Sequence, residues 1–323
     1  MIIVMDHDIL VIGESLVDIV RSRREETEFF PGGSPLNVAV GLGRLGLHPR
    51  LATWLADDEY GELITAHCEE SHVTLTPGSD KAVRTSTADA DIDDEGHAHY
   101  TFDIDWQMPP IEDTGADHAN LIHTGSIGAL VEPGAAQVLD LVEATNAFVT
   151  FDPNCRPSIM GDPADIREKV ERYIRASGLV KVSDEDLAWL YPEITTERQV
   201  VERLEQWLGM GPGAVVLTQG SKGALALTPS GTARVPADTS RTLVDTVGAG
   251  DAFMAGLIHG ILSRGAPHKQ LFRDLEIVKE ILAEATLISS VTVSRAGANP
   301  PWFSEIEDDL IACQEFIRRT RGQ

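Results

Sequence analysis

One short segment of the sequence combines two carboxylates with a flexible turn: Asp245-Thr-Val-Gly-Ala-Gly-Asp-Ala-Phe253, or DTVGAGDAF. Glycines let a backbone come close to a ligand. The residues after the turn are apolar and helix-forming, so Gly248, Ala249 and Gly250 would present the free N–H groups of a helix N-terminus. Such N–H groups, with the helix dipole, attract an anion such as a phosphate. The segment therefore predicts an anion hole with a carboxylate, Asp251, beside it.

Two interpretations of Asp251 are open. An acid in the first turn offsets the helix dipole, which explains the aspartate but not the Gly-Ala-Gly turn. A general base would accept the proton of an attacking hydroxyl while the turn holds the transferring phosphoryl group. A base within hydrogen-bond reach contributes ~10²–10⁴-fold, and the remainder of phosphoryl transfer depends on positioning and charge neutralisation. The second interpretation explains both features, so we predict a phosphoryl-transfer site.

The elements that would position this site alternate between strand and helix. Short apolar runs occur at Leu121–Thr124, Ala147–Phe151, Leu179–Val182 and Ala214–Thr218, with helical patterns at Ala135–Thr145, Asp165–Ala176 and Glu197–Leu208. This alternation predicts a parallel sheet covered by helices on both faces. A further helix is expected to begin at Asn37. The β-rich segments Leu16–Phe30 and Thr85–Asp103 do not fit the alternation, and we interpret them as a small accessory sheet.

Composition excludes several classes of protein. The 323 residues include 26 Lys and Arg against 51 Asp and Glu, a formal net charge of −25. Such a field repels nucleic acid and anionic membrane surfaces, so neither is an expected partner. Cys68, Cys155 and Cys313 form no disulfide framework, which favours a reducing cytoplasm. No secretory signal is expected, and no run approaches the ~18 apolar residues of a membrane span.

Three other motifs are better explained by structure than by ligands. Gly41-Leu-Gly-Arg-Leu-Gly46 matches the dinucleotide pattern G-x-G-x-x-G, but it lies inside a helical pattern, which favours close helix packing. Asp91–Gly96 resembles the start of a calcium loop, yet Phe102 stands where a glutamate is needed, so a hairpin turn is predicted. His97 and His99 share one face of a strand without a third ligand, and we expect no metal site there.

Two signatures in order along the chain carry a family resemblance. Gly32-Gly-Ser-Pro-Leu-Asn37 and DTVGAGDAF resemble the two signatures of the ribokinase/PfkB family of sugar kinases. The intervening landmarks are DDEYG at 57–61, FDPNCR at 151–156, KVSDEDL at 181–187, LTQGSKGAL at 217–225 and SRAGANPP at 294–301. The resemblance implies a ribokinase-like α/β fold, with a central, mostly parallel sheet flanked by helices and a small β-sheet lid. Residues 1–13, 33–84 and 109–323 would form the kinase core, and residues 14–32 and 85–108 the inserted lid.

The resemblance also implies roles at the anion hole and in the sugar site. Asp251 corresponds to the family's catalytic base, and Asp245 and Thr246 would hold a monovalent cation, K⁺, beside the hole. The residues that correspond to the family's sugar site are Asp18, Gly33, Asn37 and Arg156. Carboxylate and amide groups suit the neighbouring donors and acceptors of a polyol. Arg156 could lie near the sugar or the phosphates, or it could form a surface ion pair.

The nucleotide side is implied by a second group of residues. ATP and Mg²⁺ are the expected cofactors. Many ribokinases carry N-x-x-E where this chain has Ser183-Asp-Glu-Asp186, which leaves a water-mediated magnesium role of Asp186 open. The Lys222 ammonium could contact phosphate or only solvate its loop. The nucleotide-binding residues implied by the resemblance are Lys181, Ser183, Thr218, Gly220, Gly223 and Asn299.

The lid and the acceptor sugar complete the expectations. In this family the lid covers the sugar, so that closure expels water, and it often forms a dimer interface. We therefore expect a homodimer through the lid. GGSPLN, VSDEDL and SRAGANPP look most like fructokinases, which favours D-fructose converted to fructose 6-phosphate. A 2-keto-3-deoxygluconate kinase, a ribokinase or a nucleoside kinase remains open. Tyr100, Phe102 and Trp106 could line the lid or fill its core.

A non-catalytic sugar-binding regulator on the same scaffold is an alternative of a different class. Loss of Asp251 or of the Gly-Ala-Gly turn would indicate such a protein. Both features are intact in this sequence. The sequence therefore favours a kinase over a regulator.

Overall fold

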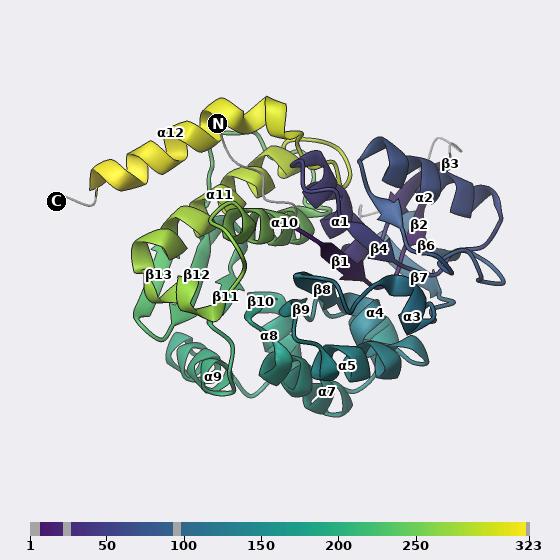
Figure 1. The fold of residues 1–323 in the computed structure, drawn as a ribbon, viewed down its shortest axis with the longest axis horizontal. Helices are drawn as coiled ribbons and strands as arrows, with labels where there is room; N and C mark the ends of the chain where they lie inside the picture. Colours follow the sequence, from purple (N-terminus) through teal and green to yellow (C-terminus); the bar gives the residue numbers. More distant parts are fainter. Residues whose placement is uncertain (1–6, 22–26, 93–97, 321–323) are drawn as a thin grey trace.

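The computed structural model describes residues 7–21, 27–92 and 98–320, which form two β-sheets and surrounding helices (Figure 1). The order of the larger, nine-stranded sheet is β13 (Gly231–Val235), β12 (Ala224–Thr228), β11 (Ala214–Thr218), β10 (Leu179–Ser183), β9 (Phe148–Asp152), β8 (Leu121–Gly125), β1 (Ile9–Ile12), β4 (Arg50–Ala52) and β5 (Thr74–Leu75). The strands from β5 to β11 run parallel, whereas β12 and β13 are antiparallel. The mostly parallel sheet predicted from the sequence is confirmed.

The smaller sheet is separate from the large one and lies beside α2 (Figure 1). Its four strands, in spatial order, are β3 (Thr27–Gly32), β2 (Leu16–Arg21), β6 (Ser86–Ile92) and β7 (Ala98–Asp103). β6 and β7 pair antiparallel, as expected for the strands on either side of a hairpin turn. The turn itself, and the side chains of His97, His99 and Tyr100, lie outside the described residues.

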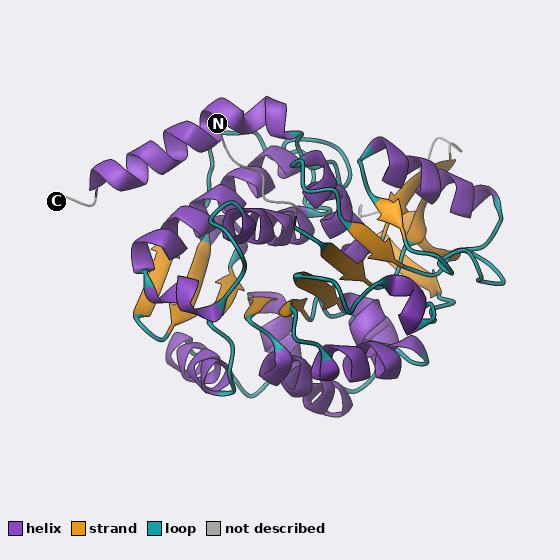
Figure 2. Ribbon diagram, in the orientation of Figure 1, coloured by secondary structure: helices purple, strands orange, loops and turns teal. Residues whose placement is uncertain are grey.

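Helices cover both faces of the large sheet (Figure 2). They are α1 (Ser34–Arg44), α2 (Glu59–Glu70), α3 (Ile111–Thr114), α4 (Ser126–Leu130), α5 (Gly134–Ala144), α6 (Pro157–Met160), α7 (Pro163–Ala176), α8 (Asp184–Leu190), α9 (Glu197–Gly209), α10 (Ala249–Leu262), α11 (Leu275–Val293) and α12 (Phe303–Thr320), with 3₁₀ turns at Gly220–Lys222 and Lys269–Arg273. Side chains alternate along a strand. On β1, Ile9 and Val11 therefore belong to the apolar cluster that includes residues of α1, α10 and α11, while Leu10 and Ile12 belong to the cluster on the other face, which includes residues of α5, α7 and α9.

Helix α1 begins at Ser34, not at Asn37 as the sequence pattern indicated. Gly33 precedes it with φ 106°, and Pro35 occupies the first turn, where its missing N–H costs nothing. Asn37 therefore closes the first turn of the helix, where its N–H donates to the Gly33 carbonyl at 2.9 Å. Two glycines of the G-x-G-x-x-G match, Gly41 and Gly43, lie at the packing surface of α1, as predicted, whereas Gly46 follows the helix with open space around it. A Cβ at Gly41 would stand 2.7 Å from the Ala255 Cβ on α10.

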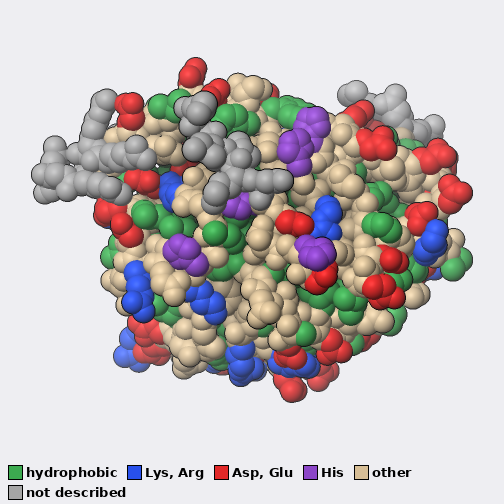
Figure 3. All heavy atoms as spheres, viewed as in Figure 1, with side chains coloured by type: hydrophobic (Ala, Val, Ile, Leu, Met, Phe, Trp, Pro, Cys, Tyr) green, Lys and Arg blue, Asp and Glu red, His purple; other side chains and the backbone are tan. Residues whose placement is uncertain are grey.

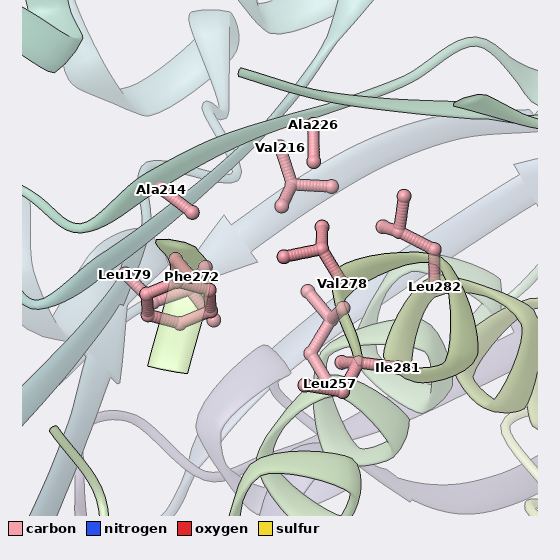
Figure 4. Close-up of a pocket in the computed structure, with 9 residues that line it drawn as sticks. All are labelled: Leu179, Ala214, Val216, Ala226, Leu257, Phe272, Val278, Ile281 and Leu282. Atoms are coloured by element: carbon pink, nitrogen blue, oxygen red, sulfur yellow. The ribbon is translucent and has the colours of Figure 1, made fainter. Parts of the chain in front are cut away.

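The contact between the large sheet and α10 and α11 encloses a small apolar cavity. Figure 4 shows the side chains around a cavity of about 10 Å³, among them Leu257 of α10, Val216 of β11 and Leu282 of α11. That volume holds one water at most, and its lining offers no hydrogen-bond partner. We interpret it as part of the core, which fixes α10 against the sheet.

Two exclusions hold for the part of the chain that the structure describes. None of its helices has the length and apolar character of a membrane span. It also contains no group of three or more His, Cys, Asp or Glu side chains that could hold a metal ion.

On the face shown in Figure 3, Lys and Arg side chains are interspersed with Asp and Glu.

Candidate active site

The DTVGAGDAF segment ends in the N-terminus of α10, as its glycines predicted. Gly248 caps the helix in the left-handed region, with φ 73°, and a Cβ there would stand 2.6 Å from the Ala298 Cβ. Only glycine combines that φ with that approach at low cost. Ala249 and Gly250 open the first turn, where backbone N–H groups lack helical partners. Asp251 follows in the same turn and is only 6% exposed.

Three side chains donate hydrogen bonds to the Asp251 carboxylate. Ser34 Oγ lies 2.7 Å from Asp251 Oδ1, and Asn37 Nδ2 lies 2.8 Å from Oδ2. Asn154 Nδ2 adds a longer bond of 3.2 Å to Oδ1. The first turn of α1 and the loop after β9 therefore meet at the start of α10. Sequence reasoning missed Ser34 and Asn154, although both stand inside quoted landmarks, GGSPLN and FDPNCR.

Asp18 occupies the same neighbourhood from the small sheet. It lies on β2, and its carboxylate packs so closely on Gly32 of β3 that a Cβ there would collide with it. The pKa of Asp18 is raised to about 6, mainly by burial. The positive charge of Arg156 opposes this rise, and the negative charge of Asp251 adds to it. The predicted residues Asp18, Arg156 and Asp251 are thus electrostatic neighbours. Gly33, with φ 106°, lies close to the backbone of Glu14.

The Arg156 guanidinium folds back onto its own loop. Its Nη1 donates to Asn154 Oδ1 at 2.7 Å, to the Asn154 carbonyl at 3.0 Å and to the Cys155 carbonyl at 3.1 Å. Asn154 has φ 34°, a left-handed conformation that asparagine tolerates. The arginine therefore fixes the loop that carries an Asp251 donor.

Glu14 is a buried carboxylate that sequence reasoning missed. It stands in the short connection between β1 and β2, is 2% exposed, and accepts a hydrogen bond from the Gly128 N–H at 2.6 Å. Burial raises its pKa to about 7, although that bond and the Arg156 charge lower it. No motif in the sequence identifies Glu14, because its hydrogen-bond partner Gly128 lies 114 residues away along the chain.

Lys181 forms a buried ion pair with Asp152, which sequence reasoning also missed. Lys181 Nζ and Asp152 Oδ2 are 2.6 Å apart, and the two side chains are 3% and 2% exposed. A Cβ at Gly250 would stand 3.2 Å from Lys181 Nζ, so the ammonium lies against the first turn of α10. Burial lowers the Lys181 pKa, but the charges of Asp152, Asp186 and Asp251 outweigh burial and raise it above its ordinary value.

Ser183 and Asp186 form the capping box of α8. Ser183 Oγ donates to Asp186 Oδ2 at 2.7 Å, and the Asp186 N–H donates to Ser183 Oγ at 3.0 Å. Asp186 Oδ1 accepts the Cys155 N–H at 2.7 Å. Both oxygens of Asp186 therefore have protein donors. The cap ties β10 to the loop that carries Asn154 and Arg156.

The other residues predicted to bind the nucleotide lie in two separate parts of the structure. Thr218 ends β11, and Gly220 and Gly223 take φ values of 50° and 96° in the turn that follows, as expected of a tight loop. Asn299 is exposed, and its Oδ1 accepts a hydrogen bond from Arg44 Nη1 at 2.6 Å. Arg44 ends α1, so the Asn299 side chain lies at the opposite end of that helix from the Asp251 donors.

Asp245 joins two loops beside the anion hole. Its Oδ1 accepts the Val247 N–H at 3.0 Å, and its Oδ2 accepts the Gly297 N–H at 2.8 Å. The Thr246 carbonyl accepts the Ala249 N–H at 3.2 Å. The half-buried Asp245 carboxylate thereby places a negative charge next to the first turn of α10.

Comparison with known proteins gives one family. Residues 6–304 match the sequence profile of the pfkB family carbohydrate kinase. A fructokinase of Klebsiella pneumoniae is 30% identical over 293 residues, which cover 87% of this chain and 94% of the relative. A fructokinase of Vibrio alginolyticus is 30% identical over 271 residues, covering 81% of this chain and 86% of the relative.

Solved structures agree on the fold. A fructokinase with bound ATP from Xylella fastidiosa superposes with a TM-score of 0.78 at 22% identity, covering 94% of this chain and 99% of that one. A ribokinase from Thermotoga maritima superposes with a TM-score of 0.71 at 22% identity, with the same coverage of 94% and 99%. The α/β architecture with a second, small sheet is therefore that of ribokinase-like kinases.

Proposed function

The chain belongs to the pfkB family of carbohydrate kinases, and from this premise we propose that it transfers the γ-phosphoryl group of ATP to a primary hydroxyl of D-fructose, giving fructose 6-phosphate. The observation that carries the proposal is the Asp251 carboxylate, held by Ser34 and Asn37 at the N-terminus of α10. It combines an oriented base with adjacent amides that attract an anion.

In this proposal Asp251 is the general base. A carboxylate offers about four lone-pair sites, and the three protein donors leave room for a substrate hydroxyl. Asp251 accepts the hydroxyl proton as the hydroxyl oxygen attacks the γ-phosphorus, and the bond from that phosphorus to the β–γ bridging oxygen breaks, which leaves ADP. The amides of Gly248 and Gly250 stabilise the charge on the transferring group, because preorganised donors need no reorientation during the reaction. The Ala249 amide is assigned to the same hole and would share its N–H with the Thr246 carbonyl, which accepts it at 3.2 Å.

The acceptor sugar lies between the small sheet and the start of α1. Asp18 accepts hydrogen bonds from sugar hydroxyls, Asn37 and the Gly33 backbone line the same space, and Arg156 approaches from the loop after β9. Residues 14–32 and 85–108 act as a lid, whose closure removes water that would otherwise take the phosphoryl group. The buried side chain of Trp106 supports a core-filling role, since its indole N–H donates to the Gly128 carbonyl at 3.0 Å.

ATP occupies the side of the site formed by β10, β11 and the turn after β11. Lys181, Ser183, Thr218, Gly220 and Gly223 serve the nucleotide. Mg²⁺ binds mainly through phosphate oxygens and water, with one or two carboxylates at most.

Two further nucleotide-side assignments stay predictions. Asn299 is assigned to the adenine side, although its side-chain oxygen is bonded to Arg44. Asp245 and Thr246 hold K⁺ beside the anion hole. The Asp245 charge between two loops supports the second assignment, and a fructokinase of Vibrio cholerae has been solved in a potassium ion bound form.

Fructose is the proposed acceptor because the two bacterial relatives at 30% identity are fructokinases. A coupled ADP-release assay with Mg²⁺-ATP, with and without K⁺, tests it. The panel contains fructose, ribose, 2-keto-3-deoxygluconate, glucose, tagatose and adenosine. Fructose should give the highest kcat/KM. A higher kcat/KM for ribose, 2-keto-3-deoxygluconate or adenosine would identify that compound as the acceptor in place of fructose. If no compound in the panel releases ADP, the non-catalytic regulator is favoured.

We also propose that two copies associate through the lid. β3 is an edge strand of the small sheet, and it forms a groove of about 480 Å³ with α2. Phe29 and Phe30 on this strand are 43% and 44% exposed, which is a liability for an isolated edge. The substitution Phe30→Glu should convert a dimer to a monomer in sedimentation velocity. A wild-type monomer would refute this assembly.

The compartment we propose is the cytoplasm. The buried Cys68 and Cys155 and the half-buried Cys313 are unpaired, as expected in a reducing environment. When the protein is alkylated in denaturant directly after lysis of its host, mass spectrometry should find all three cysteines alkylated. A disulfide in that material would contradict the assignment.

A further inference from the structure

We propose that Asp152 is a positioning residue for phosphoryl transfer, because it holds the Lys181 ammonium under the N-terminus of α10, where the ammonium adds positive charge to the anion hole from inside the protein. The inference rests on the proposed kinase function. It assigns a role to Asp152 and changes that of Lys181 from a direct nucleotide ligand to a buried charge that acts through α10.

The register of two neighbouring strands brings the pair together. Asp152 ends β9 on the sheet face toward α10, two residues after Thr150, and Thr150 pairs with Leu179 of β10. Lys181 follows Leu179 by two residues, so the side chains of Asp152 and Lys181 share that face. Their 2.6 Å contact lies next to Gly250, where a Cβ would stand only 3.2 Å from Lys181 Nζ.

The burial of this pair is poorly explained by stability. Transfer of two charges from water costs about as much as their attraction returns, and apolar replacements of buried pairs are often neutral or stabilising. Asp152 does not join a wider hydrogen-bond network either, because its second carboxylate oxygen, the buried Oδ1, has no partner among the described residues. Its recorded hydrogen bond goes from Lys181 Nζ to Oδ2, so fixing the ammonium is its identifiable task.

The position of Lys181 also excludes easy access to a nucleotide. Its side chain is 3% exposed, and its Nζ lies next to Gly250 in the first turn of α10. A charge held there still acts on a phosphoryl group through a short, water-excluded path, where charges interact more strongly than in water. It also counters the nearby carboxylates of Asp186 and Asp251, which would otherwise repel an incoming phosphate.

The test is a double-mutant cycle on turnover. Asp152→Asn keeps the shape of the side chain and removes the charge that fixes Lys181. We expect kcat to fall by about 10–100-fold, a smaller effect than loss of a direct oxyanion donor at ~10²–10³-fold, with the KM for sugar changed less than twofold. Lys181→Met should cause a similar loss. Adding Asp152→Asn to Lys181→Met should cost nothing more if Asp152 acts through Lys181.

A binding measurement separates this role from a purely structural one. Isothermal titration calorimetry compares ADP alone with ADP plus aluminium fluoride, an analogue of the transferring group, in the presence of Mg²⁺ and the sugar. Both variants should bind the fluoroaluminate combination about tenfold more weakly and ADP alone as the wild type does. Weakened binding of ADP alone by Lys181→Met would instead identify Lys181 as a direct nucleotide ligand and overturn the inference.

The matched control is a second buried ion pair, between Arg264 Nη2 and Glu284 Oε1 at 2.8 Å. Glu284→Gln perturbs the other end of α10 and should lower the melting temperature while leaving kcat within twofold. If Asp152→Asn fails to fold, Asp152→Glu keeps the charge but displaces the ammonium, and the same loss of kcat is expected. A folded Asp152 variant with wild-type kcat overturns the inference, whereas an inactive wild type overturns the proposed function itself.

Discussion

Asn37 Nδ2 lies 2.8 Å from Asp251 Oδ2, although 214 residues separate them in the sequence. The bond joins the first turn of α1 to the first turn of α10, so the two signature segments form one site. Gly41 makes that arrangement possible, because α1 and α10 approach too closely for a larger residue there. Helix packing and site geometry are therefore the same feature of this fold.

Replacing Asp251 with Asn should remove the base and keep the shape of the side chain. We expect kcat to fall by at least ~10²–10⁴-fold, the usual contribution of a general base. Sugar affinity should change little, because Asp18 supplies the sugar contacts in the proposed site. Steady-state kinetics and sugar titration by calorimetry measure the two effects. Turnover close to that of the wild type would remove Asp251 from its assigned role.

Ser34→Ala tests whether orientation of the base matters. The substitution removes a 2.7 Å bond to Asp251 Oδ1 and leaves the bond from Asn37. Because the carboxylate gains freedom without losing its basicity, we expect kcat to fall by roughly tenfold with little change in the KM for sugar. A loss confined to KM would instead place Ser34 among the sugar contacts.

Sugar binding should weaken in mild acid. Burial raises the pKa of Asp18 to about 6, and only the ionised form accepts hydrogen bonds with both oxygens. The KM for sugar should therefore be flat above pH 6 and rise by up to tenfold per unit below it. Measurements of KM between pH 5 and 8 check this. Asp18→Asn should bind sugar weakly and show no such pH dependence; a pH-dependent KM in that variant would contradict the assignment.

Glu14→Gln should stabilise the protein in a pH-dependent way. The folded-state pKa of Glu14 is raised to about 7, above its ordinary value of 4.5. Its stabilising contribution is therefore complete below pH 4.5 and is lost as the pH rises through 7. Glutamine does not titrate, so its advantage over the wild type should grow by up to about 3 kcal/mol between pH 5 and 8.

Urea unfolding of wild type and Glu14→Gln at these two pH values measures that difference. Free energies of unfolding that differ by the same amount at both pH values would contradict a raised pKa for Glu14. A second comparison with Asp140→Asn, an exposed carboxylate on α5, controls for general charge effects.

Glycines at two helix positions should respond oppositely to alanine. A Cβ at Gly43 would collide with the Ser71 carbonyl oxygen, which belongs to rigid backbone. Gly43→Ala should therefore cost about 3 kcal/mol of unfolding free energy. Gly209 at the end of α9 has open space around it, so Gly209→Ala should be neutral or stabilise by up to about 1 kcal/mol. Chemical denaturation of both variants tests the contrast.

Local sequence patterns predicted many of the strands and helices and the position of the proposed anion hole. The period of apolar residues predicted strands such as β11 and helices such as α9, because burial of one face imposes that period on the sequence. The Gly-Ala-Gly turn before Asp251 could be identified for a similar reason. The left-handed backbone of the N-cap and its close approach to Ala298 both require glycine at position 248, so the residue type itself indicates the turn.

Contacts between distant segments were decided by the tertiary structure. Nothing local to Ser34, Asn154 or Asp152 reveals that the first two bond to Asp251 or that the third fixes Lys181. Such pairings depend on strand register and helix approach, which the packing of the whole core sets. The sequence by itself thus determined which groups could do chemistry. Only the fold decided which of them touch, because side-chain distances across a core follow from packing and not from spacing along the chain.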